Sequence, residues 1–220
     1  MMYYIRLFKG IREPYVQAQQ LMKAEKAGGF WSKAILLLVI TFLLAVVSSF
    51  FGIGNEIMSK ELHNRSHTDF EAIKLLFAGG QIIWSMLQAI IILTIPSLFF
   101  WALSDLEWKK FICVQFYALT ILLIGKIVTI PFTIFMGLPD ISNPFSLGVI
   151  GQYLTSHNLI LQFLGGITVF NIWAMILQYK YVRVLLERSR LLTLLFVIGF
   201  NLIMLVISVF LQIMDLEKLL

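Results

Sequence analysis

Long apolar runs alternate with short polar segments along this sequence. Five of the runs are long enough to cross the hydrocarbon core of a bilayer, which takes about 20 predominantly apolar residues. They lie at about 34–54, 75–103, 112–137, 159–179 and 191–214. The pattern predicts an all-α, polytopic integral membrane protein whose five transmembrane helices form a membrane domain over 34–214. The composition agrees, because 60% of the residues are hydrophobic and only 13% are charged, outside the range of ordinary soluble domains.

The segments outside this domain are short. Residues 215–220 would form a short outer tail, and residues 1–33 a basic cytoplasmic lead-in to the first span. In the lead-in, Pro14 suits the first turn of a helix, and good helix formers continue to Gly28 and Gly29. Two alternatives fit this stretch. It is either an amphipathic helix that lies on the membrane surface and is hinged at the glycines, or a solvated basic segment that orients the first span.

The distribution of Lys and Arg predicts the orientation, because cytoplasmic loops of membrane proteins carry an excess of these residues. Twelve of the 17 lie in the N-terminal segment and in the loops 104–111 and 180–190, four lie in the first long loop and the tail, and Lys126 is left over. We therefore place the N-terminus in the cytoplasm and the C-terminus outside, in the plasma membrane. The net charge of +5 then reflects topology, and we expect no nucleic-acid partner.

Lys126 lies inside an apolar run. It is about 11 residues, or roughly 16 Å, from the outer end of its predicted helix and therefore close to the bilayer midplane. Side chains lean toward the helix N-terminus, which here is the more distant surface, so extension to water is poor. An unpaired ammonium group in lipid costs from about 2.5 kcal/mol upward. Lys126 therefore needs polar partners, a water-filled cavity or the loss of its proton.

The same depth count gives Lys126 four polar neighbours on other helices. Thr41, Gln88, Asn171 and Asn201 all lie about 12 or 13 residues from the outer face, near the level that the lysine head would reach. Amide side chains commonly hold membrane helices together, so we favour a structural or partner-binding polar cluster. The alternative is a path for an anion or small solute, lined by the lysine and the amides.

Two prolines interrupt the predicted spans. Pro96 and Pro131 each remove a helical hydrogen bond and free the carbonyl four residues earlier, at Ile92 and Ile127. We therefore predict a kink in the second and third helices.

Catalysis and metal binding find little support. The sequence has no intramembrane pair of aspartates and none of the common hydrolase, metalloprotease or phosphate-loop motifs. We therefore expect a protein that is not an enzyme and that needs no cofactor. His63 and His67 have the i, i+4 spacing of a zinc ligand pair, but the residues around them disfavour a rigid helix, so they are weak metal candidates.

Two stretches of the sequence are similar to those of a known protein family. "EPYVQAQQLMKAEKAGGFW" precedes the first span, and "NPFSLGVIGQYLTSHNLILQFLGGITVFNIWAMILQYKYVRVL" carries a Pro-containing outer loop into the fourth. The "FNIW" centre of that helix, Phe170 to Trp173, looks like the pattern of hydrophobic, Asp or Asn, hydrophobic and Trp that is typical of the Yip family. With five spans and an inner N-terminus, residues 10–214 resemble the bacterial branch of these Ypt-interacting-protein-like membrane proteins.

This resemblance implies a non-enzymatic membrane accessory or scaffold protein. Eukaryotic relatives engage prenylated Rab-type GTPases, but the "DLYGP"-like motif of their cytoplasmic segment is absent here, so GTPase binding is not carried over. Some bacterial relatives are encoded with ABC exporters resembling the MacAB type, which implies a role in assembling or regulating a transporter. The partners to expect are the lipid bilayer, other membrane proteins such as an ABC exporter and, as an alternative, further copies of the chain in a homo-oligomer.

Overall fold

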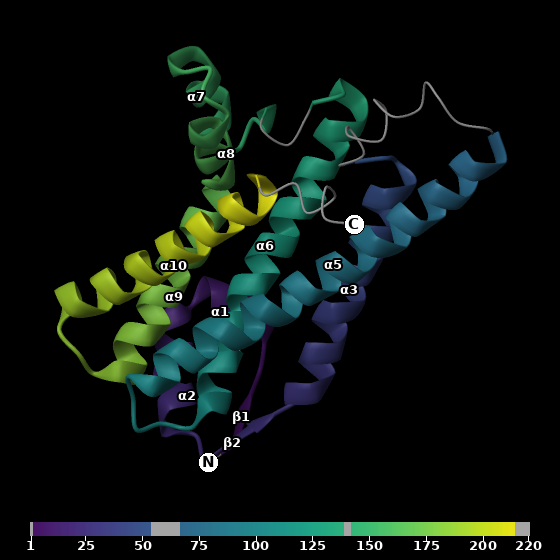
Figure 1. Cartoon of the computed structure of the whole chain (residues 1–220). Helices are drawn as coiled ribbons and strands as arrows, with labels where there is room; N and C mark the ends of the chain where they lie inside the picture. The colour runs from purple at the N-terminus through teal and green to yellow at the C-terminus, as the bar shows by residue number, and fades with distance from the viewer. Residues whose placement is uncertain (1, 54–66, 139–141, 214–220) are drawn as a thin grey trace.

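The described chain is almost entirely helical, as Figure 1 shows. The computed structural model describes residues 2–53, 67–138 and 142–213, and the side chains of these except 67–73 and 212–213. The predicted outer tail lies outside the described residues. In chain order the elements are β1 (Met2–Tyr4), α1 (Leu7–Arg12), α2 (Pro14–Lys23), β2 (Lys26–Gly28), α3 (Phe30–Phe50), α5 (His67–Ala102), α6 (Trp108–Met136), α7 (Gly148–Leu154), α8 (Asn158–Gly166), α9 (Val169–Leu186) and α10 (Arg190–Ile213).

Four helices are long and apolar enough to cross a membrane. They are α3, the Lys74–Ala102 part of α5, α6, and the Arg190–Leu211 part of α10. These four agree with four of the five predicted runs. Pro96 and Pro131 lie inside α5 and α6, which continue past them to Ala102 and Met136. The kinks at these prolines stay a prediction.

The remaining predicted run, 159–179, is not one continuous helix. α8 ends at Gly166, and α9 begins at Val169 after a break. Two adjacent glycines, Gly165 and Gly166, weaken the helix at this point. The segment that precedes α7 then satisfies the exposed backbone of the break. Leu147 N–H donates to the carbonyl of Ile167 at 3.0 Å, and Val169 N–H donates to that of Phe145 at 2.9 Å.

Helix α6 is the centre of the bundle and contacts α3, α5, α9 and α1. Of its most apolar stretch 72% is buried within the protein, against 17–22% for the other three candidate spans. Every residue from Phe111 to Thr120 is buried. Because no side of this part of α6 is left open, lipid has no access to it, whereas α3, α5 and α10 present broad apolar faces to their surroundings.

The N-terminal segment supplies part of that cover. Strand β1 pairs in parallel with β2, with Tyr3 opposite Ala27, and α1 and α2 pack on α6 and α9 respectively. The buried side chains of the segment include Tyr3, Ile5 and Leu21. As predicted, Pro14 begins a helix, and the chain turns at Gly29, whose φ of +76° lies in the left-handed region. One face of the segment is therefore packed against the bundle. Whether its other face meets water or the membrane surface stays a prediction.

The Lys- and Arg-rich segments gather at one end of the bundle. In Figure 1, β1, β2 and α2 of the N-terminal segment lie toward the lower part, and so do the start of α6 and the end of α9. The basic loops 104–111 and 180–190 fall at these two helix ends. We call this the basic end. Its position agrees with the charge segregation that the predicted orientation requires.

We expect the substitution Gly10→Ala to loosen the N-terminal segment. A Cβ atom at residue 10 would overlap the ring of Tyr117, and such overpacking costs about 1–3 kcal/mol. Gly79→Ala is the matched control, because nothing lies within 4 Å of the added methyl group in α5. We expect a lower thermal midpoint in mild detergent and faster trypsin cleavage at Lys9 and Arg12 for Gly10→Ala only. Equal behaviour of the two variants would show that α1 is not docked on α6.

Candidate functional site

A pocket of about 260 Å³, partly open to the surroundings, lies between α3, α5, α6 and the beginning of α9. We call it the cavity. Leucine, isoleucine and phenylalanine side chains form part of its wall. Its polar lining residues are Thr41, Ser85, Gln88, Lys126, Thr129, Asn143, Thr168 and Asn171. A polar chamber of this kind can hold water or a polar ligand, whereas an apolar cavity stays dry.

The break between α8 and α9 places the start of α9 at this cavity. Thr168 caps the helix, because its hydroxyl oxygen accepts a hydrogen bond from the Asn171 backbone N–H at 3.1 Å. The Asn171 side chain donates to the carbonyl of Gly166 at 2.6 Å. Both residues line the cavity, so the helix end with partial positive charge faces it.

Gly125 allows α9 to approach α6 next to Lys126. A Cβ atom at residue 125 would lie 2.7 Å from the Cγ atom of Phe170, which is closer than real Cβ contacts permit. Gly125, Lys126 and Phe170 all line the cavity. The absence of a side chain at Gly125 therefore lets the two helices close the chamber.

Lys126 is the one charged residue among the described residues that line the pocket. The threonine hydroxyls are partly used within their own helices, because Thr41 donates to the carbonyl of Leu37 at 2.8 Å and Thr129 to that of Lys126 at 3.3 Å. Their oxygen atoms keep the capacity to accept hydrogen bonds.

The structure brings four of the five sequence-predicted cluster residues together. Thr41, Gln88, Lys126 and Asn171 line the same cavity. Asn201 does not join them. Its side chain donates to Gln178 Oε1 at 2.9 Å and to the carbonyl of Val197 at 2.8 Å.

Asn201 belongs instead to a second polar group, a buried row of amides. Gln178 Nε2 donates to Gln115 Oε1 at 2.8 Å, so the row joins α10, α9 and α6. Gln115 and Gln178 are buried. Sequence reasoning missed both, although each is an amide residue inside a predicted span, because it considered only residues at the depth of Lys126.

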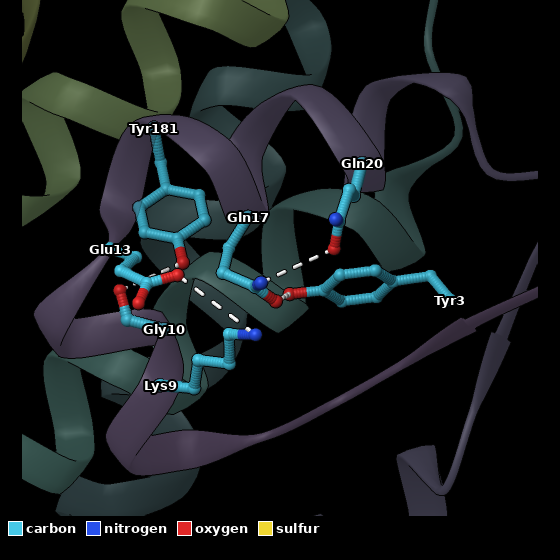
Figure 2. Close-up of polar contacts among 7 residues, drawn as sticks. All are labelled: Tyr3, Lys9, Gly10, Glu13, Gln17, Gln20 and Tyr181. Atoms are coloured by element: carbon cyan, nitrogen blue, oxygen red, sulfur yellow. Dashed lines mark hydrogen bonds and ion pairs between the residues drawn. The ribbon is translucent and has the colours of Figure 1, made fainter.

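Sequence reasoning also missed a group of tyrosines that holds the N-terminal segment in place, partly drawn in Figure 2. Tyr3 OH donates to Gln17 Oε1 at 3.0 Å and lies 2.7 Å from Tyr117 OH. Tyr181 OH donates to the carbonyl of Gly10 at 3.0 Å, and the Tyr117 and Tyr181 rings stack with centroids 5.0 Å apart. These contacts tie β1, α1 and α2 to α6 and α9.

The direction of the hydrogen bond between Tyr3 and Tyr117 follows from the number of protons that each hydroxyl can donate. A phenol has one proton to donate. Because Tyr3 donates its proton to Gln17, Tyr117 is the donor in the bond between the two tyrosines. Burial raises the pKa of Tyr3, and the hydrogen bond with Tyr117 acts in the opposite direction. Tyr3 thus remains a neutral donor at physiological pH.

The structure does not test the two histidines that are weak metal candidates. His63 lies outside the described residues, and His67 begins α5 in the stretch whose side chains are not described. Within the described ranges, no three His, Cys, Asp or Glu side chains are grouped as metal ligands would be.

Comparison with known proteins gives no relative for this chain. The sequence matches no protein-family model, and neither the curated proteins nor the solved structures contain a significant match.

We expect substitutions in this row of amides to have non-additive effects on the stability of the protein. The substitution Gln178→Leu leaves the buried Gln115 side chain without its partner, at a cost of about 1–3 kcal/mol. Replacing both partners by leucine removes the stranded Gln115 amide, and Asn201 keeps its bond to the carbonyl of Val197 in both variants. Gln115→Leu/Gln178→Leu should therefore be more stable than Gln178→Leu alone. Thermal or denaturant unfolding in detergent measures both. Simple addition of the two single losses would contradict a direct Gln115–Gln178 bond.

Proposed function

We propose that the protein is a non-enzymatic accessory or scaffold protein of a cell membrane, which binds and helps to assemble or regulate partner membrane proteins. In this proposal the chain crosses the membrane five times, with α8 and α9 together as a broken fourth span. The N-terminus is cytoplasmic and the C-terminus is outside. The resemblance to the bacterial Yip branch supports this proposal and makes an exporter of the ABC type the first candidate partner.

The observation that carries the proposal is the folded surface at the basic end. The tyrosine contacts hold β1 against α6 and α1 against α9, and α1 then exposes Phe8, of which 79% is accessible. Arg6, Lys9 and Arg12 beside it are exposed as well. A preorganised surface binds a partner at a lower entropic cost than a flexible tail.

The chemistry of this surface indicates the kind of partner. An exposed aromatic residue with Arg and Lys residues close to it in the chain is suited to a pocket with a polar rim, because aromatic and Arg residues are enriched at interfaces. Lys9 itself pairs with Glu13 at 4.0 Å. The surface belongs to the N-terminal segment, whose strands β1 and β2 lie at the basic end of the bundle (Figure 1). The complementary surface would therefore be the cytoplasmic part of another membrane protein.

A photo-crosslinking phenylalanine analogue at position 8 tests this proposal in native membranes. We expect an adduct with a specific integral membrane protein, which mass spectrometry identifies and which copurifies with the unmodified chain in mild detergent. Phe8→Ala should lower that copurification at least tenfold, since loss of a buried aromatic anchor costs about 2 kcal/mol.

The matched control carries the analogue at Phe135, which is 87% exposed near the end of α6 opposite the basic end. The proposal fails if the position-8 probe reacts only with lipid and no membrane protein copurifies.

A second candidate function is a small transporter or channel for an anion or small solute. The cavity favours it, because Lys126 and several amide and hydroxyl side chains line one chamber. Discontinuous helices that start at a chamber inside the bilayer are a recurrent feature of transporters.

A further inference from the structure

The chain turns back along α6 before it enters α7. The ring of Phe145 packs against that of Phe132 of α6, with centroids 5.5 Å apart, and against that of Phe170 of α9, at 5.7 Å. Phe132 precedes the end of α6 at Met136 by one helical turn, or roughly 6 Å. Asn143 lines the cavity, which lies deeper in the bundle. The segment before α7 therefore lies alongside the last turns of α6.

From this level α7 and α8 form a helical hairpin, residues 148–166, which stands at the top of Figure 1. The two helices pack closely, because a Cβ atom at Gly151 would lie 2.8 Å from Cδ1 of Leu164. The inner end of α8 lies beside α10, since a Cβ atom at Gly166 would lie 3.0 Å from Cδ1 of Leu205. The hydrogen bonds of the break fix both ends of the hairpin there.

The exposed surface of the hairpin is apolar. Its large exposed side chains are those of Ile150, Tyr153, Leu154, Leu159 and Ile160, at 48–88% accessibility. The whole stretch 141–179 contains no Asp, Glu, Lys or Arg. Polar side chains gather at the turn 155–158, and the exposed Gln152 donates to Ser142 Oγ at 2.8 Å. A continuous apolar surface of this kind is typical of an interaction site.

The dimensions of the hairpin fit one leaflet of a bilayer. α7 has 7 residues and α8 has 9, which gives roughly 10 and 14 Å, about half of the 30 Å hydrocarbon core. The polar turn is at the far end, and Tyr153 lies next to it, as is common for aromatic residues at a membrane surface. The non-helical backbone at the inner end has its hydrogen bonds satisfied by protein, which is the condition for irregular backbone at membrane depth.

We propose that the hairpin is a re-entrant element of the outer leaflet. Lipid acyl chains cover Ile150 and the other apolar side chains, and the turn 155–158 lies at the outer membrane surface. The segment between the third and fourth spans is then largely embedded in the membrane and is not an outer loop. This inference rests on the membrane location given in the proposed function, but not on the accessory role.

The test uses single-cysteine variants of the full chain in nanodiscs of phosphatidylcholine, labelled with bimane, a small fluorophore. The native Cys113 is buried, so the wild-type chain measures the background. Ile150→Cys and Ser156→Cys are both at exposed positions, but only position 150 would meet lipid. We expect a nitroxide on the lipid acyl chain to quench the label at position 150, and dissolved iodide to quench the label at position 156.

Val206→Cys is the membrane control, because Val206 is 49% exposed on the candidate span α10. Lipid quenching at position 206 with iodide quenching at position 150 overturns the re-entrant hairpin and leaves the membrane location standing. Loss of lipid quenching at position 206 as well would overturn the membrane location itself.

Protection of position 150 from both quenchers also overturns the proposal, because protein, such as a second copy of the chain, then covers the apolar face. Should Ile150→Cys fail to fold, Leu147→Cys at the inner end of α7 takes its place, since Leu147 is 38% exposed. The same two outcomes, iodide quenching or protection from both quenchers, overturn the proposal there.

Discussion

Every side chain from Phe111 to Thr120 on α6 is buried, and a helix reaches that state only when other segments cover it all around. The helices α3, α5 and α9 do not surround α6 completely near its basic end, and α1 contacts α6 on the remaining side. The N-terminal segment fills that side through Tyr3, Leu7 and Leu21. The position of the first 28 residues is thus determined by the need to cover a helix that begins 80 residues later in the chain.

The opposite half of α6 has a different environment, and the difference originates in the break between α8 and α9. The chain turns at Ile167, and the backbone of Phe145 and Leu147 takes up the hydrogen bonds that the break releases. The result is a chamber beside Lys126, placed where a helix end can face its contents. One helix therefore has a sealed half and a half that lines a polar chamber.

Sequence patterns predicted those parts of the structure that depend on local composition. Four apolar runs became long apolar helices, and a count of residues along them placed Thr41, Gln88 and Asn171 at the level of Lys126. Depth alone does not determine which way a residue faces. For that reason Asn201, at the same level, pairs with Gln178 in another part of the bundle.

Long-range contacts were not predictable in this way. The bond between Tyr3 and Tyr117 joins residues 114 positions apart, and a short N-terminal segment has too few apolar residues to indicate what it packs against. The break after Gly166 could not be predicted from hydropathy, because the apolar run 159–179 continues through it. The pair Gly165–Gly166 is only a weak local sign of the break, because α5 continues through the pair Gly79–Gly80.

Two adjacent tyrosines allow the docking of the N-terminal segment on α6 to be measured in the unmodified protein. Tyr3 is 4% exposed and Tyr4 is 61% exposed, although their chemistry and position in the chain are nearly the same. Hydroxyl-radical footprinting of the wild-type protein in nanodiscs, read out by mass spectrometry, compares their rates of oxidation directly. Docking through Tyr3 predicts rapid oxidation of Tyr4 and protection of Tyr3, at rates at least tenfold apart, whereas equal oxidation of the two residues would contradict it.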